Sequence, residues 1–179
     1  MSRNEQETEA VDESQTTETE NKITLDASGN AAAGDQSTEN KTAEPSTLDE
    51  LFGGENLSVT YTGAEIAANY MEGGYYSLDA EQGKTFVIVG IDITNSGADE
   101  IAIDNFAKTP KFSVMVNGQE KAEEENTILP SDFALYQETV PAGVTENTIL
   151  LFQVPDSVTS VDSLDLFVNI SGTNYQITL

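Results

Sequence analysis

One stretch of the sequence, residues 83–95, limits the fold more than any other part of the chain. It holds the longest uninterrupted run of β-branched and aromatic residues, GKTFVIVGIDITN, and such a run predicts a central β-strand. Because side chains alternate between the faces of a strand, one face would be continuously aliphatic, with Val87, Val89, Ile91 and Ile93. The opposite face is apolar at its start and polar at its end, so we expect it to be buried at the start of the strand and exposed to solvent at the end. Four aliphatic side chains need a facing layer, and the strand therefore predicts a second sheet.

The remainder of the apolar part consists of short alternating stretches separated by turn residues. About eight strands are expected, the first at Leu57–Thr62, and no long helix. Alternating apolar residues over 133–137 predict another short strand. Asn117-Gly118 is the strongest hairpin signal, because both residues tolerate the positive φ of a type I′ turn. This pattern predicts an all-β sandwich.

Composition divides the chain near residue 46. Residues 1–46 contain eleven acidic and three basic residues but few large apolar ones, so burial cannot offset the entropy of ordering them. We expect a disordered acidic tail that acts as a tether, or else as a solubilising extension only. Residues 47–179 are rich in Val, Ile, Leu, Tyr and Phe, and we expect one domain there. A single capped helical turn is expected within Pro45–Phe52.

The formal net charge of −25 makes binding to anionic partners unfavourable. Arg3 is the only arginine, and four lysines lie within residues 47–179. No basic stripe is therefore available to bind nucleic acid or an anionic membrane surface. No apolar segment approaches the length of a membrane span, so we expect no direct membrane insertion. Partners should be neutral, cationic or bridged by a metal.

The sequence contains neither cysteine nor histidine. It therefore lacks disulfides, thiolate nucleophiles, the commonest general base and the commonest transition-metal ligand. We expect no catalytic residues and a non-enzymatic protein. An acidic leader directly before a compact β domain is typical of a protein whose signal segment has been removed, so we expect a mature or truncated form.

Several motifs together resemble the immunoglobulin-like domain-of-unknown-function family of Gram-positive surface lipoproteins, within the immunoprotective extracellular immunoglobulin-like superfamily. The resemblance covers about residues 55–179, and its motifs are Gly83–Asn95, Phe112 with Asn117-Gly118-Gln119, Val140-Pro141-Ala142-Gly143, Leu151-Phe152-Gln153-Val154-Pro155 and Leu164-Asp165-Leu166. The resemblance implies an immunoglobulin-like antiparallel sandwich outside the cell, tethered by a lipid on an N-terminal cysteine. This sequence departs from the family by having no cysteine, so the anchor is inferred for the full-length form only. The family offers no catalytic residues to carry over.

Tyr70, Tyr75 and Tyr76 are the candidate ligand-binding residues. They lie beside Gly73-Gly74, and tyrosines next to a tight turn offer rigid contact area at low entropic cost. The competing explanation is that one or two of these rings pack into the core.

The candidate metal ligands are Asp99, Glu100, Asp104 and Asn105, oxygen donors in turns of the kind that Ca²⁺ prefers. Their spacing does not match an EF-hand, and solvated acidic loops are the competing explanation. We expect no cofactor, with Ca²⁺ at these residues as the alternative.

The expected function is therefore a non-enzymatic extracellular module, the soluble part of a lipoprotein, that binds a protein or glycan or serves as a spacer. The alternative is a carboxylate-based hydrolase or calcium-binding module that uses the acidic loops. The hydrolase requires two carboxylates that share a concave pocket.

Overall fold

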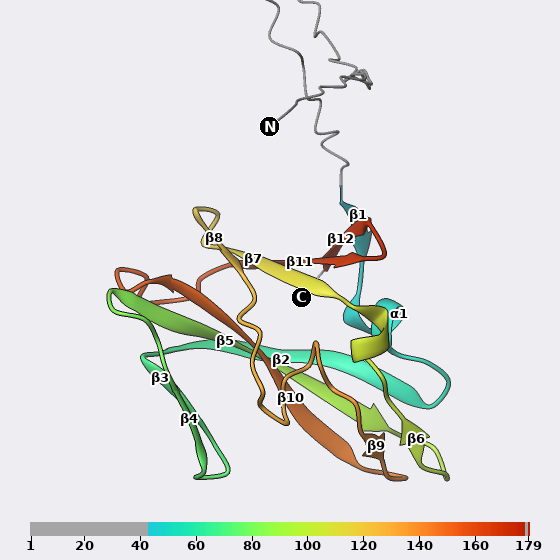
Figure 1. Ribbon diagram of the computed structural model, residues 1–179. Helices are drawn as coiled ribbons and strands as arrows, with labels where there is room; N and C mark the ends of the chain where they lie inside the picture. Colours follow the sequence, from blue (N-terminus) through green and yellow to red (C-terminus); the bar gives the residue numbers. More distant parts are fainter. Residues whose placement is uncertain (1–42, 178) are drawn as a thin grey trace, which may run out of the picture. The chain divides into compact units, whose positions relative to one another are not determined.

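The computed structural model describes residues 43–177 and 179. They form an all-β, immunoglobulin-like sandwich, which confirms the predicted fold class (Figure 1). The first half of the described chain contains β1 (Glu44–Ser46), α1 (Leu48–Phe52), β2 (Leu57–Ala67), β3 (Asn69–Glu72), β4 (Tyr76–Asp79), β5 (Lys84–Asn95) and β6 (Ile101–Ala102). The second half contains the 3-10 helix η1 (Phe106–Lys108), β7 (Lys111–Val116), β8 (Glu120–Glu123), β9 (Thr139–Val140), β10 (Thr145–Pro155), β11 (Leu164–Ile170) and β12 (Thr173–Ile177).

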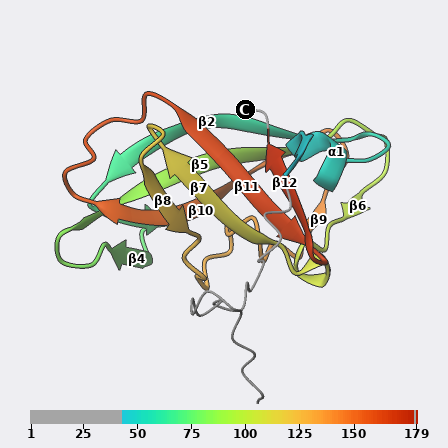
Figure 2. The same cartoon turned by 90° about the horizontal axis from the view of Figure 1, so that it is seen from above.

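Eight strands build the two layers of the sandwich. One sheet has five strands in the order β1-β12-β11-β7-β8, and the other has three in the order β10-β5-β2. Viewed from above, β7 and β11 lie across β5 and β10 (Figure 2). Two smaller antiparallel pairs, β3–β4 and β6–β9, stand outside these sheets. Among the described residues, no helix has the length and apolar character needed to cross a membrane.

The inner face of β5 forms the centre of the core, as predicted. Val87, Val89, Ile91 and Ile93 are at most 1% exposed, and β5 pairs with β2 on one side and β10 on the other. The facing sheet supplies buried residues of β7 and β11 to the same cluster. Burial of these aliphatic side chains between two layers is what holds the sheets together.

The outer face of β5 is covered at its start and more open at its end, which also confirms the prediction. Phe86 and Ile88 are buried in a second cluster with Leu129 and Leu151. The β3–β4 hairpin contributes Leu78 to this cluster. The hairpin therefore packs on the sandwich through one face rather than standing free.

The short helix α1 confirms the predicted capped turn. Thr47 and Glu50 form a capping box, in which the Glu50 backbone N–H donates to the Thr47 side chain. Phe52, at the other end, packs against the rings of Phe112 and Phe133 at centroid distances of 5.8 and 5.0 Å. The helix thereby closes one end of the core.

The Asn117-Gly118 turn between β7 and β8 forms as predicted. Asn117 has φ of 53° and Gly118 has φ of 67°, the left-handed region that this pair tolerates.

Two expectations about strands were wrong. The first strand is β1, which pairs in parallel with β12, so the fold begins upstream of both Leu57 and the boundary expected at residue 47. Residues 133–135 form a turn and residues 136–137 have no regular structure, so no strand forms there. Side chains satisfy the backbone instead: Asn105 Nδ2 donates to the Phe133 carbonyl, and Ala134 N donates to Asp132 Oδ1. The rest of the expected tail, residues 1–42, lies outside the described residues.

Candidate functional site

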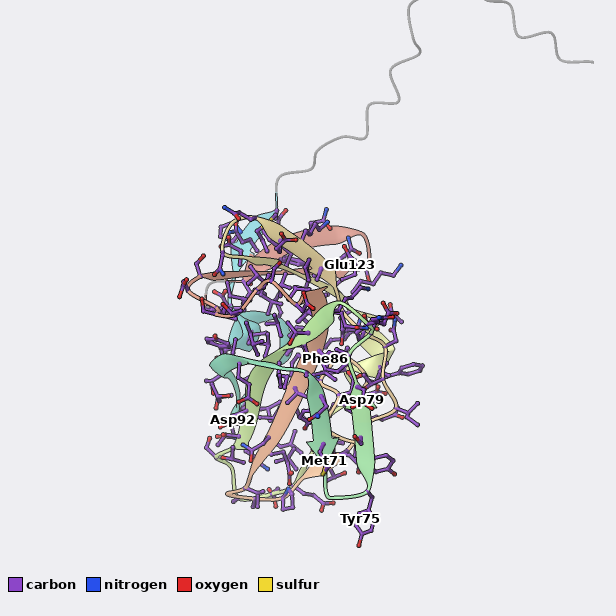
Figure 3. All side chains as sticks on the ribbon, turned by 90° about the vertical axis from the view of Figure 1, so that its left-hand side faces the viewer. Met71, Tyr75, Asp79, Phe86, Asp92 and Glu123 are labelled. Atoms are coloured by element: carbon purple, nitrogen blue, oxygen red, sulfur yellow. The ribbon has the colours of Figure 1, made fainter. Side chains whose placement is uncertain are left out.

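The β3–β4 hairpin carries the three tyrosines singled out from the sequence. Its two strands pair from Asn69 opposite Asp79 to Glu72 opposite Tyr76. The reversal uses Gly73 and Gly74, whose φ angles of 58° and 73° are in the left-handed region that glycine enters without strain. This turn places Tyr75 at the end of the hairpin (Figure 3).

The structure separates the three tyrosines into two roles. Tyr70 packs against the second core cluster, as the competing explanation proposed for one of them. Tyr75 is 92% exposed and Tyr76 is 44% exposed. Met71, which the sequence reasoning did not single out, is 64% exposed. We call Met71, Tyr75 and Tyr76 the hairpin tip.

The body of the hairpin is fixed to the sandwich. The Tyr70 hydroxyl lies 3.4 Å from Ser131 Oγ, and Ser131 Oγ donates to Glu72 Oε2 at 2.6 Å. Tyr70 and Leu78, opposite each other on the two strands, both pack on the second cluster. The exposed tip thus extends from an anchored base.

An open, acidic pocket lies next to the base of the hairpin. It has a volume of about 330 Å³, and its lining includes Glu72, Ser131, Tyr136, Glu138, Glu146 and Asn147. Tyr136 is only 7% exposed. Its burial, followed by the charges of Glu146 and Glu138, raises the pKa of its hydroxyl. We call this cavity the acidic pocket.

No local pattern in the sequence indicates the acidic pocket, because its residues come from separate elements. Glu72 ends β3, Tyr136 and Glu138 lie between β8 and β9, and Glu146 lies near the start of β10. Only the pairing of strands and the path of the 125–139 segment bring them to one place.

A pair of carboxyl groups, the half-buried Glu124 and the buried Asp132, was also missed from the sequence. Asp132 is 4% exposed and accepts hydrogen bonds from Thr127 Oγ1 at 2.7 Å and from Ala134 N at 3.1 Å. Burial, the Asp132 charge and a hydrogen bond with Asp132 raise the pKa of Glu124 to about 9. Glu124 is therefore protonated at neutral pH. Strand periodicity offered a signal, since Ala122 of β8 is buried and a period of two turns Glu124 inward as well.

A hydrolase site needs an acid and a base on either side of one substrate, and the acidic pocket and the Glu124–Asp132 pair each meet only part of this requirement. Several carboxylates share the acidic pocket, as the hydrolase reading required. The protonated acid, Glu124, lines a different pocket of about 180 Å³ between β7 and the segment after β8. Asp132 does not line the pocket of Glu124. The structure therefore does not combine an acid and a base around one substrate site in this pair.

The candidate calcium ligands are not brought together as a ligand set. Asp99, Glu100 and Asp104 are exposed, and Asp104 Oδ1 accepts a hydrogen bond from Ala107 N. Asn105 is 2% exposed, and its side-chain amide donates a hydrogen bond to the Phe133 carbonyl. Within residues 43–177 and 179, no group of three or more acidic side chains could hold a metal ion.

No family model matches the sequence, and no curated protein matches it. The fold is similar to that of an uncharacterised β-sandwich protein from Clostridium difficile 630, with 18% identity over 69% of this chain and 85% of that chain and a TM-score of 0.44. A conserved hypothetical protein from Bacillus anthracis is 11% identical over 70% of this chain and 89% of that one, with a TM-score of 0.38. A proposed lipoprotein from Bacillus subtilis is 11% identical over 69% of this chain but only 36% of its own, with a TM-score of 0.36. At these identities the likeness concerns the fold alone.

Proposed function

We propose that this protein is a non-enzymatic extracellular binding module, the soluble part of a lipoprotein, and that its hairpin tip contacts a protein partner. The observation that carries this proposal is the exposure of Tyr75 and Met71, at 92% and 64%, on a hairpin that is otherwise packed on the sandwich. Exposed large side chains that lie together on a surface are typical of sites that a partner covers.

The chemistry of the hairpin tip favours a protein over a glycan. Tyrosine and methionine are both enriched in the buried centre of protein interfaces. Tyrosine adds large contact area with few rotatable bonds and a hydroxyl that can bond at the rim, and methionine adapts its shape to irregular surfaces. Glycan recognition is the alternative that the experiment below also measures.

The anchoring of the hairpin supports binding at its tip. Because Tyr70, Glu72 and Ser131 are joined by hydrogen bonds, the strands below the tip are held in place before a partner arrives. A surface that is ordered in advance loses less conformational entropy on binding. The partner is expected to be neutral or basic, since residues 47–179 carry 21 acidic residues against four lysines.

The non-enzymatic part of the proposal is supported by the chemistry of the side chains. The sequence has no histidine and no cysteine, and the protonated Glu124 lies outside the acidic pocket. A nucleophile would have to be activated without the usual bases. Hydrolysis of a glycoside or ester by the wild-type chain that Glu124→Gln abolishes would contradict this part.

The placement outside the cell rests on the resemblance of the sequence to surface lipoprotein domains and on the acidic composition of residues 1–46. Protease added to intact cells that express the full-length protein should remove the domain. Complete resistance of the domain, with lysed cells as the positive control, would contradict this placement.

Binding at the hairpin tip is tested with the full chain on arrays of purified extracellular proteins and of cell-wall glycans. The variant Tyr75→Ala/Tyr76→Ala should lose affinity for a protein partner by about 10- to 100-fold, the range for residues at the centre of an interface. Phe106→Ala is the matched control, because Phe106 is 56% exposed but lies in η1 beside Lys108, which bonds to α1. Equal losses in both variants, unchanged binding of the double variant, or hits on glycans only would refute the proposal.

A further inference from the structure

The acidic pocket adjoins the proposed contact surface, and its charge is not balanced by the protein. Glu72, Glu138 and Glu146 all line it. The ion pairs among the described residues, Lys84 with Glu81 and Lys121 with Glu123, lie elsewhere. Lys108 bonds to the Leu51 carbonyl, and Lys111 lines the pocket of Glu124. A cationic ligand in this pocket would therefore meet carboxylates without displacing a lysine.

Tyr136 provides a second, independent observation. Its ring is buried in the main core, while its hydroxyl lies among the carboxylates of the pocket. After burial itself, the charges of Glu146 and Glu138 raise the pKa of this hydroxyl. No side-chain hydrogen bond of this hydroxyl is found among residues 43–177 and 179, and its oxygen is open to the pocket rather than sealed in the core. The hydroxyl is therefore free to accept a bond from a ligand that enters the pocket.

The dimensions of the pocket favour an organic cation over a metal ion. No three acidic side chains of the described residues converge closely enough to hold a metal. The volume of about 330 Å³ also exceeds what a single ion needs, since one water takes up about 30 Å³ in the liquid. A primary ammonium has three N–H donors that can bond to separate oxygens, whereas guanidinium is best matched by one carboxylate in its own plane.

The register of the hairpin connects this pocket to the hairpin tip. Glu72 pairs with Tyr76, so the two side chains lie on the same face of the hairpin. A protein seated on Tyr75 and Tyr76 would pass over the mouth of the pocket. We propose that the acidic pocket receives the primary ammonium of a lysine side chain from the protein that binds the hairpin tip. This inference rests on the proposed function and specifies its partner as one that presents a lysine beside an apolar surface.

The pocket is tested by itself with a small probe, Nα-acetyl-lysine amide, added to the ¹⁵N-labelled full chain. The expected result is saturable amide shifts near Glu138 and Glu146 with a millimolar dissociation constant, and no such shifts with the Nε-acetylated probe, which lacks the charge. Glu138→Gln/Glu146→Gln should weaken binding at least about tenfold, and Tyr136→Phe about threefold or more. The control Glu120→Gln/Glu123→Gln removes the same charge from β8 and should bind as the wild type does.

Glu123 is a suitable control because it lies at the end of the domain opposite Tyr75 (Figure 3). Equal weakening by the two double variants would show attraction by overall charge only and would overturn the pocket. Shifts that are scattered over the surface, or equal binding of the acetylated probe, would also overturn it. Thermal unfolding of each variant checks that a loss of binding is not a loss of folding.

A second probe distinguishes failure of the pocket from failure of the hairpin tip. The peptide acetyl-Leu-Lys-Leu-amide should bind more tightly than the single lysine, and Tyr75→Ala/Tyr76→Ala should remove this gain while leaving the single lysine unaffected. If the single lysine binds but the gain does not depend on the tyrosines, the source assigned to the ammonium is wrong. If neither lysine probe binds, the pocket is wrong, and binding of a protein to the hairpin tip is still measured separately on the arrays.

Discussion

Replacement of Glu124 by glutamine should remove a loss of stability that the wild-type domain shows as the pH rises. Glu124 is held against Asp132, and burial with that neighbouring charge raises its pKa to about 9. The same side chain in the unfolded chain titrates near 4.5. Between these values the native state binds one more proton than the unfolded state. The free energy of unfolding therefore decreases as pH rises, and the contribution of Glu124 is complete only below about pH 4.5.

The size of the effect follows from this difference in pKa. One proton of difference changes the free energy of unfolding by about 1.4 kcal/mol per pH unit. Between pH 6 and pH 8 the wild type should lose up to about 3 kcal/mol through this group. Glutamine keeps a hydrogen-bond donor toward Asp132 but does not titrate, so Glu124→Gln should lack this loss. Relaxation around the pair would reduce the difference, and we expect at least about 1 kcal/mol across the interval.

The measurement is urea unfolding at pH 6, 7 and 8 for the wild type and two variants. Glu123→Gln is the matched control, because Glu123 is the adjacent residue of β8 and its side chain is 71% exposed in a pair with Lys121. Such a pair contributes little, so this variant should follow the wild-type pH profile. A profile of Glu124→Gln that is parallel to the wild type over this interval would show that Glu124 does not cause the pH dependence, whatever the offset between the two.

The fold and the tail lead to three further predictions. Ile91→Asp should prevent cooperative folding, seen as loss of the β-sheet circular dichroism signal, because it places an unpaired charge where a residue is 0% exposed; a cooperative melt like the wild type's would contradict this. Thr47→Ala should lower the free energy of unfolding by about 1 kcal/mol in urea unfolding, because it removes the cap of α1, and no change would show that the cap is not needed. Limited proteolysis should remove residues 1–42 and leave a core that retains β1, whereas protection of Thr8–Asn40 in hydrogen exchange would contradict the expected disorder of that segment.

The parts of the fold that could be predicted from sequence are those where a local pattern and the tertiary structure agree. The aliphatic face of β5 is regular over four alternate positions, all of them buried. Asn117-Gly118 and the Thr47 cap are local too, since each depends on the conformational preference of a few neighbouring residues.

The parts that could not be predicted depend on pairing between distant segments. β1 has only three residues, two of them exposed, and exists because β12 lies beside it. The strands of the β3–β4 hairpin have four residues each, too few to show a period. The same reason explains the candidate site: Tyr70 and Tyr75 look equivalent in the sequence, and only the packing of the hairpin on Phe86 and Ile88 decides which ring is covered.

Amide hydrogen exchange of the full chain with and without its protein partner shows whether the hairpin tip is the contact surface. The partner should slow exchange in residues 71–78, with additional protection near Glu138 and Glu146 if a lysine enters the acidic pocket. Protection confined to the five-stranded sheet, with unchanged exchange in residues 71–78, would contradict the claim.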